Sequence, residues 1–257
     1  MTVETERSTE PTLGDRISVC MATYNGAPYL AKQIESIIEQ LEAGDELLVA
    51  DDGSDDTTRE LLRRYEPALT IVAVDRVGGV VPNFSRVLSH ARGDYVLLAD
   101  QDDVWLPGRA SRFRNELKHH ELVFCNAWVV DEHLQPTGVS LFDQICPGPG
   151  FWRNLVKTSS FVGCCMGFRR SLLRGVLPLP VQTPLHDWLL GLKASLRGRV
   201  AQVDTPLMLY RRHAGNVSNT GEVSRNGLRR KIGLRIDVLG ALAVCLWRSC
   251  GPNGELG

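Results

Sequence analysis

The sequence has little net charge and no long hydrophobic run. Its 257 residues carry 29 Lys and Arg against 30 Asp and Glu, so no basic surface of the kind that binds nucleic acid extends over the chain. Residues 1–15 are polar and lack the apolar core of a secretory signal, which predicts a disordered leader and a cytoplasmic location. The apolar stretch at residues 238–247 is too short and too interrupted to span a bilayer.

Several cofactor signatures are also missing. The seven cysteines are scattered and form no Cys-x-x-Cys pair, which argues against a disulfide framework and against a zinc site. No Gly-x-Gly-x-x-Gly turn follows a predicted strand, which sets a dinucleotide oxidoreductase aside. The loop at residues 23–28 has no basic residue, whereas an enzyme that makes nucleotide sugars would need a basic, glycine-rich phosphate loop there.

What is present in the first half of the chain is an alternation of short apolar runs and amphipathic segments. Strands are predicted at residues 17–22, 46–50, 71–74 and 95–99, and helices at 29–41, after Ser54 as an N-cap, and at 82–90. This order predicts an α/β fold with a mixed, mostly parallel sheet flanked by helices. Ligands of such sheets collect where the parallel strands end, so the loops after the strands are the candidate site.

The pattern loosens after a predicted strand at residues 122–126. A further strand is predicted at 164–168, and a helix with Thr183 as its cap and Pro184 at its first position. We expect one domain over residues 16–219. Residues 220–257, basic and then apolar, predict a helical tail that either packs on the domain or a dimer partner, or lies on a membrane surface.

The most informative loop follows the strand at residues 95–99 and contains Asp100, Asp102 and Asp103. Three carboxylates within four residues repel one another, and a divalent cation among them relieves that cost. Mg²⁺ or Mn²⁺ held in this way completes its coordination with phosphate oxygens. The alternative is a solvated acidic turn.

A second acidic loop, residues 51–56, follows the strand at 46–50. Asp52 could accept a hydrogen bond from a nucleoside base or a ribose, although Asp-Gly is also a good turn and Ser54 a good cap. Tyr24, in the loop after the first strand, could stack on the base or only pack at the strand end.

Candidate catalytic residues occur in the second half. Asp187 falls in the first turn of a predicted helix, where a carboxylate is favoured by the helix dipole; it could equally act as a general base. His213 has no visible partner, and Arg211 and Arg212 could face a diphosphate or water.

The order and spacing of these segments resemble the inverting glycosyltransferases of family 2, which have the GT-A fold, and in particular their rhamnosyltransferase-like branch. The matching segments are ISVCMATYNG at 17–26, LVADDGS at 48–54, LLADQDDVW at 97–105, GCCMGFR at 163–169, HDW at 186–188 and YRRHAGNVS at 210–218. His186 departs from many relatives, which have an acid before the catalytic aspartate.

The resemblance implies a role for each matched residue. The nucleotide contacts would be Thr23, Tyr24, Asn25, Asp52 and Asp100; the metal ligands, for Mg²⁺ or Mn²⁺, Asp102 and Asp103; the diphosphate contacts Arg211 and His213; and the catalytic base Asp187.

The implied reaction is inverting transfer of a sugar from a dTDP-rhamnose or UDP-sugar donor to an acceptor hydroxyl in polysaccharide or glycan biosynthesis. Polymerising relatives have several membrane helices and a Gln-x-x-Arg-Trp motif; neither is present, which favours a single addition. The acceptor would be a glycan or lipid-linked, and the tail could contact the inner face of the membrane. The alternative is an inactive nucleotide-sugar-binding module that regulates or scaffolds.

Overall fold

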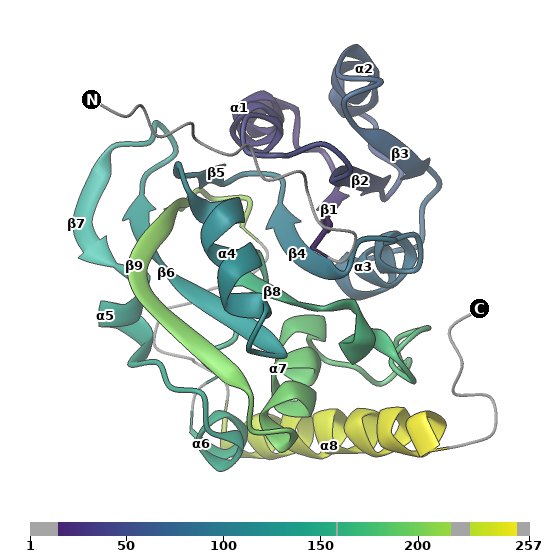
Figure 1. Ribbon diagram of the computed structural model, residues 1–257, viewed down its shortest axis with the longest axis vertical. Helices are drawn as coiled ribbons and strands as arrows, with labels where there is room; N and C mark the ends of the chain where they lie inside the picture. The colour runs from purple at the N-terminus through teal and green to yellow at the C-terminus, as the bar shows by residue number, and fades with distance from the viewer. Residues whose placement is uncertain (1–14, 158, 217–226, 251–257) are drawn as a thin grey trace, which may run out of the picture.

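A single sheet, flanked by helices, organises the protein (Figure 1). The computed structural model describes residues 15–157, 159–216 and 227–250. The predicted leader therefore lies outside the described residues apart from Asp15. The strands are β1 (Ile17–Thr23), β2 (Glu46–Asp51), β3 (Thr70–Ala73), β4 (Tyr95–Asp100), β5 (Val104–Trp105), β6 (Leu122–Val130), β7 (Pro136–Ser140), β8 (Met166–Arg169) and β9 (Val200–Arg211).

The sheet is mixed, in the order β3-β2-β1-β4-β8-β6-β9-β5, with β7 beside β6. The first four strands of this order are parallel, so their carboxyl ends meet at one edge. β8 then runs antiparallel to both β4 and β6. Because of this reversal, the start of β8 lies beside the end of β4, and the second half of the chain reaches the same edge.

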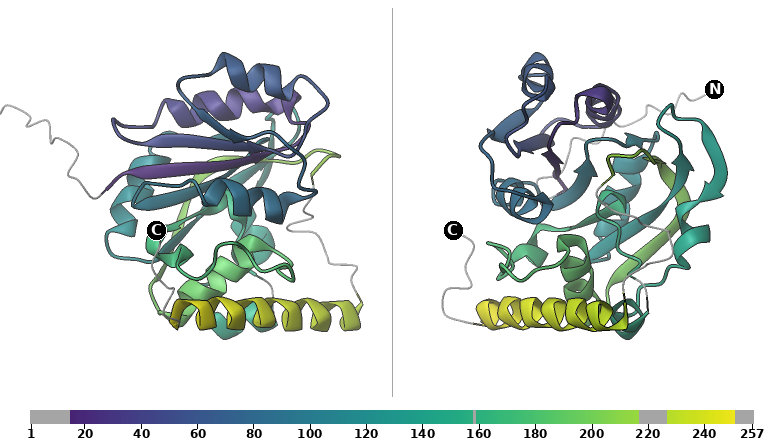
Figure 2. Two further views of the ribbon diagram at one scale, coloured as in Figure 1. Left: turned by 90° about the vertical axis from the view of Figure 1, so that its right-hand side faces the viewer. Right: turned by 180° about the vertical axis from the view of Figure 1, so that it is seen from behind.

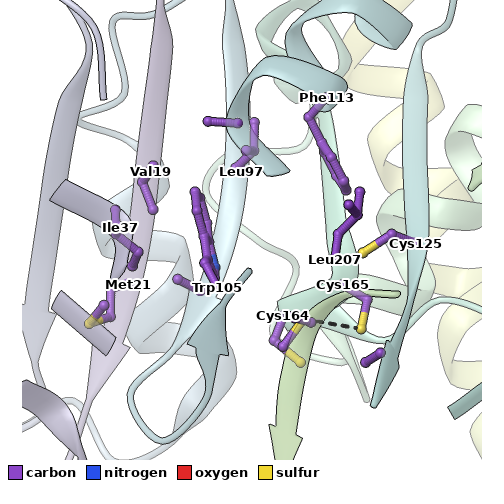
Figure 3. Packing of buried hydrophobic residues seen from close by; sticks show 14 of the residues in the cluster. Val19, Met21, Ile37, Leu97, Trp105, Phe113, Cys125, Cys164, Cys165 and Leu207 are labelled. Carbon is purple, nitrogen blue, oxygen red and sulfur yellow. Dashed lines mark hydrogen bonds between the residues drawn. The ribbon is translucent and has the colours of Figure 1, made fainter. Parts of the chain in front are cut away.

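Helices cover both faces of the sheet (Figure 2). Alternate β1 side chains explain this: Val19 and Met21 join the core beneath α1, while Cys20 joins the core with Phe84 of α3. Figure 3 shows part of the first core. The helices are α1 (Ala27–Ile38), α2 (Thr58–Arg64), α3 (Val80–Leu88), α4 (Arg109–Leu117), α5 (Leu141–Ile145), α6 (Phe151–Val156), α7 (His186–Leu196) and α8 (Leu228–Cys250), with 3₁₀ turns η1 (Gly163–Cys165) and η2 (Arg170–Leu173).

Two of the predicted helix caps are wrong. The helix after Ser54 begins only at Thr58, because the Ser54 hydroxyl donates to Asp51 Oδ2 at 2.5 Å instead of capping. Likewise α7 begins at His186 rather than at Pro184, with Leu185 at the N-cap position and no side-chain cap. In both cases a tertiary contact or an extended entry to the helix overrides the local preference.

α8 packs against α7 and buries Val238, Ala241, Leu242 and Cys245. Among the residues that the structure describes, no helix combines the length and the hydropathy needed to cross a membrane.

A close backbone approach fixes the start of β4. Gly93 donates its N–H to Ser18 Oγ at 2.7 Å, and a Cβ at Gly93 would lie 2.6 Å from Ser18 N and 2.7 Å from Arg16 O. We expect Gly93→Ala to lower the free energy of unfolding by about 1–3 kcal/mol, since backbone atoms must move. Gly240→Ala is the matched control: it has open space on a helix and should stabilise by about 0.5–1 kcal/mol. Urea unfolding followed by circular dichroism measures both, and a Gly93→Ala protein as stable as the parent would contradict this packing.

Candidate active site

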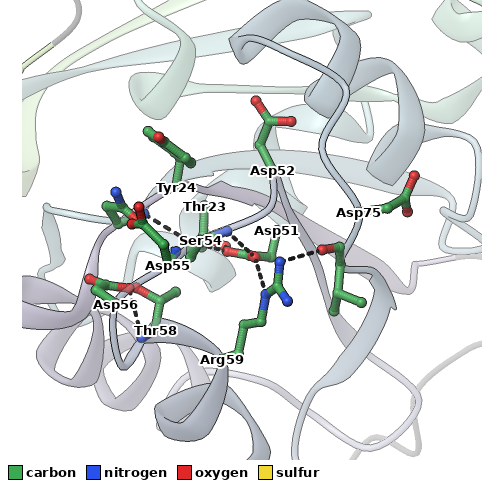
Figure 4. Close-up of polar contacts among 12 residues, drawn as sticks. Thr23, Tyr24, Asp51, Asp52, Ser54, Asp55, Asp56, Thr58, Arg59 and Asp75 are labelled. Atoms are coloured by element: carbon green, nitrogen blue, oxygen red, sulfur yellow. Dashed lines mark hydrogen bonds and ion pairs between the residues drawn. The ribbon is translucent and has the colours of Figure 1, made fainter.

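The candidate site lies where β1, β2 and β4 end, and two of its acids, Asp51 and Asp52, are buried. Asp51 at the end of β2 is fully buried and accepts hydrogen bonds from the hydroxyls of Thr23 and Ser54 and from Arg59 Nε. Figure 4 shows this cluster. Through the Thr23 and Ser54 hydroxyls, Asp51 ties the β1 loop to the β2 loop.

Asp52 has a different set of partners. Its Oδ1 accepts from the backbone N–H groups of Val77 and Gly78, at 2.5 and 2.9 Å, and its Oδ2 from Gly79, at 2.7 Å. Burial raises the pKa of Asp52, but these amides and the Arg76 guanidinium outweigh it, and the pKa lies below its usual value. Asp52 is therefore an anion that orders the loop before α3, with acceptor capacity left on Oδ2.

The loop after β1 is held rigidly on both sides. Tyr24 exchanges two hydrogen bonds with the Gln101 side chain, at 2.8 and 3.0 Å, and the Asn25 N–H donates to Ser54 Oγ. The Tyr24 ring is 42% exposed with the Arg76 guanidinium 5.7 Å from its centroid. An aromatic face held this way is available for a flat ligand to stack on.

The acidic loop forms a compact cluster with a thiol. One ligand atom each of Asp100, Asp103 and Cys164 lie within 4.8 Å of one another. Burial, followed by the charges of Asp102 and Asp187, raises the pKa of Asp100 to about 7. Burial, followed by the charges of Asp102 and Asp100, raises the pKa of Asp103 as well. Asp103 Oδ1 accepts from the Arg211 N–H, whereas Oδ2 is buried and has no hydrogen-bond partner among the described residues.

Asp102 faces a different neighbour. Its Oδ2 lies 2.8 Å from His213 Nε2 and accepts from Asn216 Nδ2 at 3.1 Å. The His213 ring also lies 4.4 Å from the Tyr29 ring, centroid to centroid. The segment after β9 is thus fastened over the acidic loop through Asp102.

Arg211 connects the same two segments. Its Nε donates to the Asp102 carbonyl at 2.7 Å, and its guanidinium carbon lies 4.7 Å from the centroid of the Tyr29 ring. Its Nη2 is buried with no partner in the described part of the chain. One donor of this cation therefore remains for an additional acceptor.

Asp187 sits in the first turn of α7 against η1. Gly163 donates its N–H to Asp187 Oδ2 at 3.0 Å, and Trp188 N–H donates to Oδ1 at 2.7 Å. Burial raises the pKa of Asp187 to about 6, against these two hydrogen bonds, which lower it. A carboxylate with such a pKa is suited to accept a proton near neutral pH.

His186 precedes this acid and is buried against Phe84, ring centroids 4.0 Å apart. Burial lowers the pKa of His186 to about 3, so the ring is neutral at physiological pH. Neither ring nitrogen has a hydrogen-bond partner among the described residues. A neutral histidine therefore lies beside a titrating acid.

The structure brings the residues singled out in the sequence to one edge of the sheet. The charges of Asp187 and Asp100 interact, although Asp100 ends β4 and Asp187 lies in α7, 87 positions further along the chain. Sequence reasoning missed three contributors: Cys164, Asn216 and the Gly163 amide. All three fall inside the motifs GCCMGFR and YRRHAGNVS, but only the reversal at β8 shows that Cys164 meets Asp100.

Comparison with solved structures defines the class of fold. Staphylococcus aureus TarS residues 1–349, in complex with UDP-GlcNAc, superposes with a TM-score of 0.64 at 22% identity, covering 91% of this chain and 72% of the TarS 1–349 chain. The mannosyltransferase PcManGT from Pyrobaculum calidifontis, in complex with GDP-Man and Mn²⁺, gives 0.55 at 19% identity, covering 94% and 76%. The fold is accordingly the GT-A fold of glycosyltransferases, as the resemblance in sequence implied.

Sequence comparison then gives the family. The model of glycosyl transferase family 2 matches residues 18–177, more than half of the chain. The dTDP-rhamnosyl transferase RfbG of Shigella flexneri is 27% identical over 264 residues, which cover 92% of this chain and 88% of RfbG. The chain belongs to glycosyl transferase family 2 and is a glycosyltransferase that uses a nucleotide-sugar donor in glycan biosynthesis.

Proposed function

We propose that this enzyme transfers one sugar, with inversion, from a nucleotide-diphosphate donor to an acceptor hydroxyl. The observation that carries the proposal is the placement of Asp187, a buried acid with a pKa of about 6, close enough to the acidic loop after β4 for its charge to act on Asp100. In an inverting transfer the acceptor hydroxyl must lose its proton as its oxygen attacks the sugar carbon. Asp187 is the residue that would take that proton.

The nucleotide would bind over β1 and β2. The exposed Tyr24 ring offers a stacking face, Thr23 and Asn25 line the same loop, and Asp52 Oδ2 keeps capacity to accept from a base or ribose. Asp100, at the end of β4, would be a further contact of the nucleotide. Arg211, with its free Nη2, and His213 would face the diphosphate.

A divalent cation fits the acidic loop. Asp103 Oδ2 is buried and has no hydrogen-bond partner among the described residues. Burial first, and then the neighbouring negative charges, raise the pKa values of Asp100 and Asp103, and a cation would relieve the repulsion between those charges. Mg²⁺ or Mn²⁺ would be held by Asp103 and Asp100, with Asp102 completing the site if His213 releases it. When bound, the cation neutralises charge on the departing diphosphate.

The donor is proposed from the likeness in sequence. RfbG is named a dTDP-rhamnosyl transferase and aligns over most of both chains, which favours dTDP-rhamnose. UDP- and GDP-sugars stay as alternatives, because TarS and PcManGT are named with those ligands. The acceptor is proposed to be a glycan or a lipid-linked glycan on the cytoplasmic side, extended by a single sugar. An inactive binding module is the second candidate, and the intact surroundings of Asp187 speak against it.

Thermal unfolding in the presence of dTDP-, UDP- and GDP-sugars, each with and without Mn²⁺ or Mg²⁺, tests the donor site. A ligand at 100 times its dissociation constant stabilises the native state by about 2.7 kcal/mol, so one nucleotide class should raise the melting temperature by several degrees, and only with metal. No shift with any nucleotide sugar under any metal condition would remove the proposal. A shift without turnover of any acceptor extract would favour the binding module.

A further inference from the structure

One face of α8 is apolar although nothing in the described structure covers it. Ile236 and Trp247 are 64% and 78% exposed, and Ile232, Leu239 and Leu246 are exposed as well. The spacings of four, three and seven residues from Ile232 to Leu246 keep these positions, with Trp247, on one side of the helix, so they form one stripe along it. The opposite side of α8 holds the buried Val238, Ala241, Leu242 and Cys245. The helix therefore has a second apolar face beyond the one that attaches it to the domain.

The neighbouring helix α6 contributes two more exposed apolar side chains. Trp152 and Val156, one turn apart on α6, are 72% and 61% exposed. Arg235 of α8 donates to the carbonyls of Val156 and Lys157, at 2.7 and 3.0 Å, which fixes α6 beside α8. Together the two helices form the lower edge of the molecule in Figure 1. We define the α6–α8 face as Trp152, Val156, Ile232, Ile236, Leu239, Leu246 and Trp247 with the cations around them.

The charges that border this face are almost all positive. Arg229, Arg230, Lys231 and Arg235 lie in the first turns of α8, and Lys157 follows α6. Asp237 is the one acid among residues 228–250, which make up α8. Apolar side chains with tryptophans, flanked by cations, match the boundary between the headgroups and acyl chains of an anionic bilayer.

We propose that the α6–α8 face docks the enzyme on an anionic lipid bilayer, with α8 lying in the plane of the interface. A second copy of the chain fits less well. In a symmetric dimer this face would meet itself, and five cations on each side would find only Asp237 of the other copy to pair with. Anionic headgroups supply the missing negative charge.

α8 begins on the side of the molecule where the parallel strands end and runs from there along the bottom of the molecule, as the left view of Figure 2 shows. The docking inference itself does not depend on transferase activity, because binding to vesicles is measured without donor or acceptor.

Flotation of the full chain with vesicles tests the proposal. Vesicles of phosphatidylcholine and phosphatidylglycerol in equal parts should bind the protein at least tenfold more strongly than phosphatidylcholine alone, and added salt should weaken the binding. Ile236→Ser/Trp247→Ser and, separately, Arg229→Gln/Arg230→Gln should each lower the partition coefficient roughly tenfold or more. Brominated lipids should quench the tryptophan fluorescence of the parent and quench the Ile236→Ser/Trp247→Ser protein less.

Matched controls are available on the rest of the surface. Trp128→Ser removes an exposed tryptophan from β6, and Arg63→Gln/Arg64→Gln removes two exposed cations from the last turn of α2; neither should change vesicle binding. Unchanged thermal unfolding shows that each variant is folded. The proposal is overturned if the parent does not bind anionic vesicles, or if the controls weaken binding as much as the α8 variants. Light scattering that shows a dimer lost in Ile236→Ser/Trp247→Ser, without vesicle binding by the parent, would assign the face to a second copy instead.

Discussion

Asp187→Asn should lower kcat by about 10²- to 10⁴-fold, the range over which a positioned general base contributes. The asparagine keeps the shape of the side chain, and its carbonyl oxygen can still accept from the Gly163 amide that now donates to Asp187 Oδ2 at 3.0 Å. It loses the capacity to take a proton and, at the other atom, the hydrogen bond from the Trp188 N–H. Donor binding should stay within about twofold of the parent, because the nucleotide contacts proposed over β1 and β2 do not include Asp187.

Release of nucleoside diphosphate in the presence of acceptor measures the loss, and the thermal shift with donor and metal measures binding. Asp204→Asn is the matched control, since Asp204 is an exposed acid on β9 and its change should leave both quantities unaltered. If Asp187→Asn abolishes donor binding together with turnover, Asp187 is part of the donor site and the base assignment fails.

The pH dependence of the parent follows from the same residue. Asp187 must be ionised to act as a base, and burial raises its pKa to about 6. Below that pH, kcat/KM should fall about tenfold per unit, and above it the rate should level off. The range from pH 5 to pH 8 brackets the pKa of about 6. A kcat/KM profile that stays flat over this range would show that proton removal by Asp187 does not limit the reaction.

Strands that are continuous apolar runs could be predicted from the sequence, and strands with interrupted patterns could not. β1, β2 and β4 were predicted nearly to the residue, because each is a short apolar run that ends in a polar loop. β9 was missed: it contains Asp204 and Pro206, which break the alternation, and its pairing with β6 shifts register around Asn126. Residues 200–211 are a strand because they pair with β6, and their composition alone does not indicate one.

In the candidate site, the acidic residues could be predicted from the sequence, but their hydrogen-bond and cluster partners could not. The acidic residues after the strands stand out in sequence because carboxylates gather at one edge of a parallel sheet. Their partners do not, because Cys164 reaches Asp103 through the antiparallel pairing of β8 with β4, and Asn216 reaches Asp102 through the pairing of β9 with β5. The sequence also assigned Asp102 and Asp103 alike to the metal, whereas the structure pairs Asp102 with His213 and groups Asp103 with Asp100.

Asp103→Asn should abolish the metal-dependent thermal shift and lower activity by about 10²-fold or more, since metal coordination contributes several kcal/mol to stabilising transition-state charge. The variant keeps an oxygen that can accept from the Arg211 N–H, as Asp103 Oδ1 does at 3.0 Å, so the segment after β9 stays in place. It removes the charge on the buried, unpartnered Oδ2. Titration with Mn²⁺, followed by the melting temperature, measures the loss, and Asp237→Asn on α8 is the control.

The same variant should be more stable than the parent when metal is absent, and this separates a metal site from a structural acid. Burial and neighbouring acids raise the pKa values of Asp100 and Asp103, so the folded state binds more protons than the unfolded state between the usual carboxyl pKa and about 7, the pKa of Asp100. The stability of the metal-free parent therefore falls as pH rises through that window.

Asp103→Asn removes one of the repelling charges. At pH 8 its free energy of unfolding should exceed that of the metal-free parent by about 1–3 kcal/mol, the usual cost of an unsatisfied buried polar group. At pH 4, where these carboxyls are protonated in the folded parent, the two proteins should differ little. A variant less stable than the metal-free parent at pH 8 would mean that Asp103 supports the fold through contacts of its own, and the cation would then have to be assigned to Asp100 and Asp102.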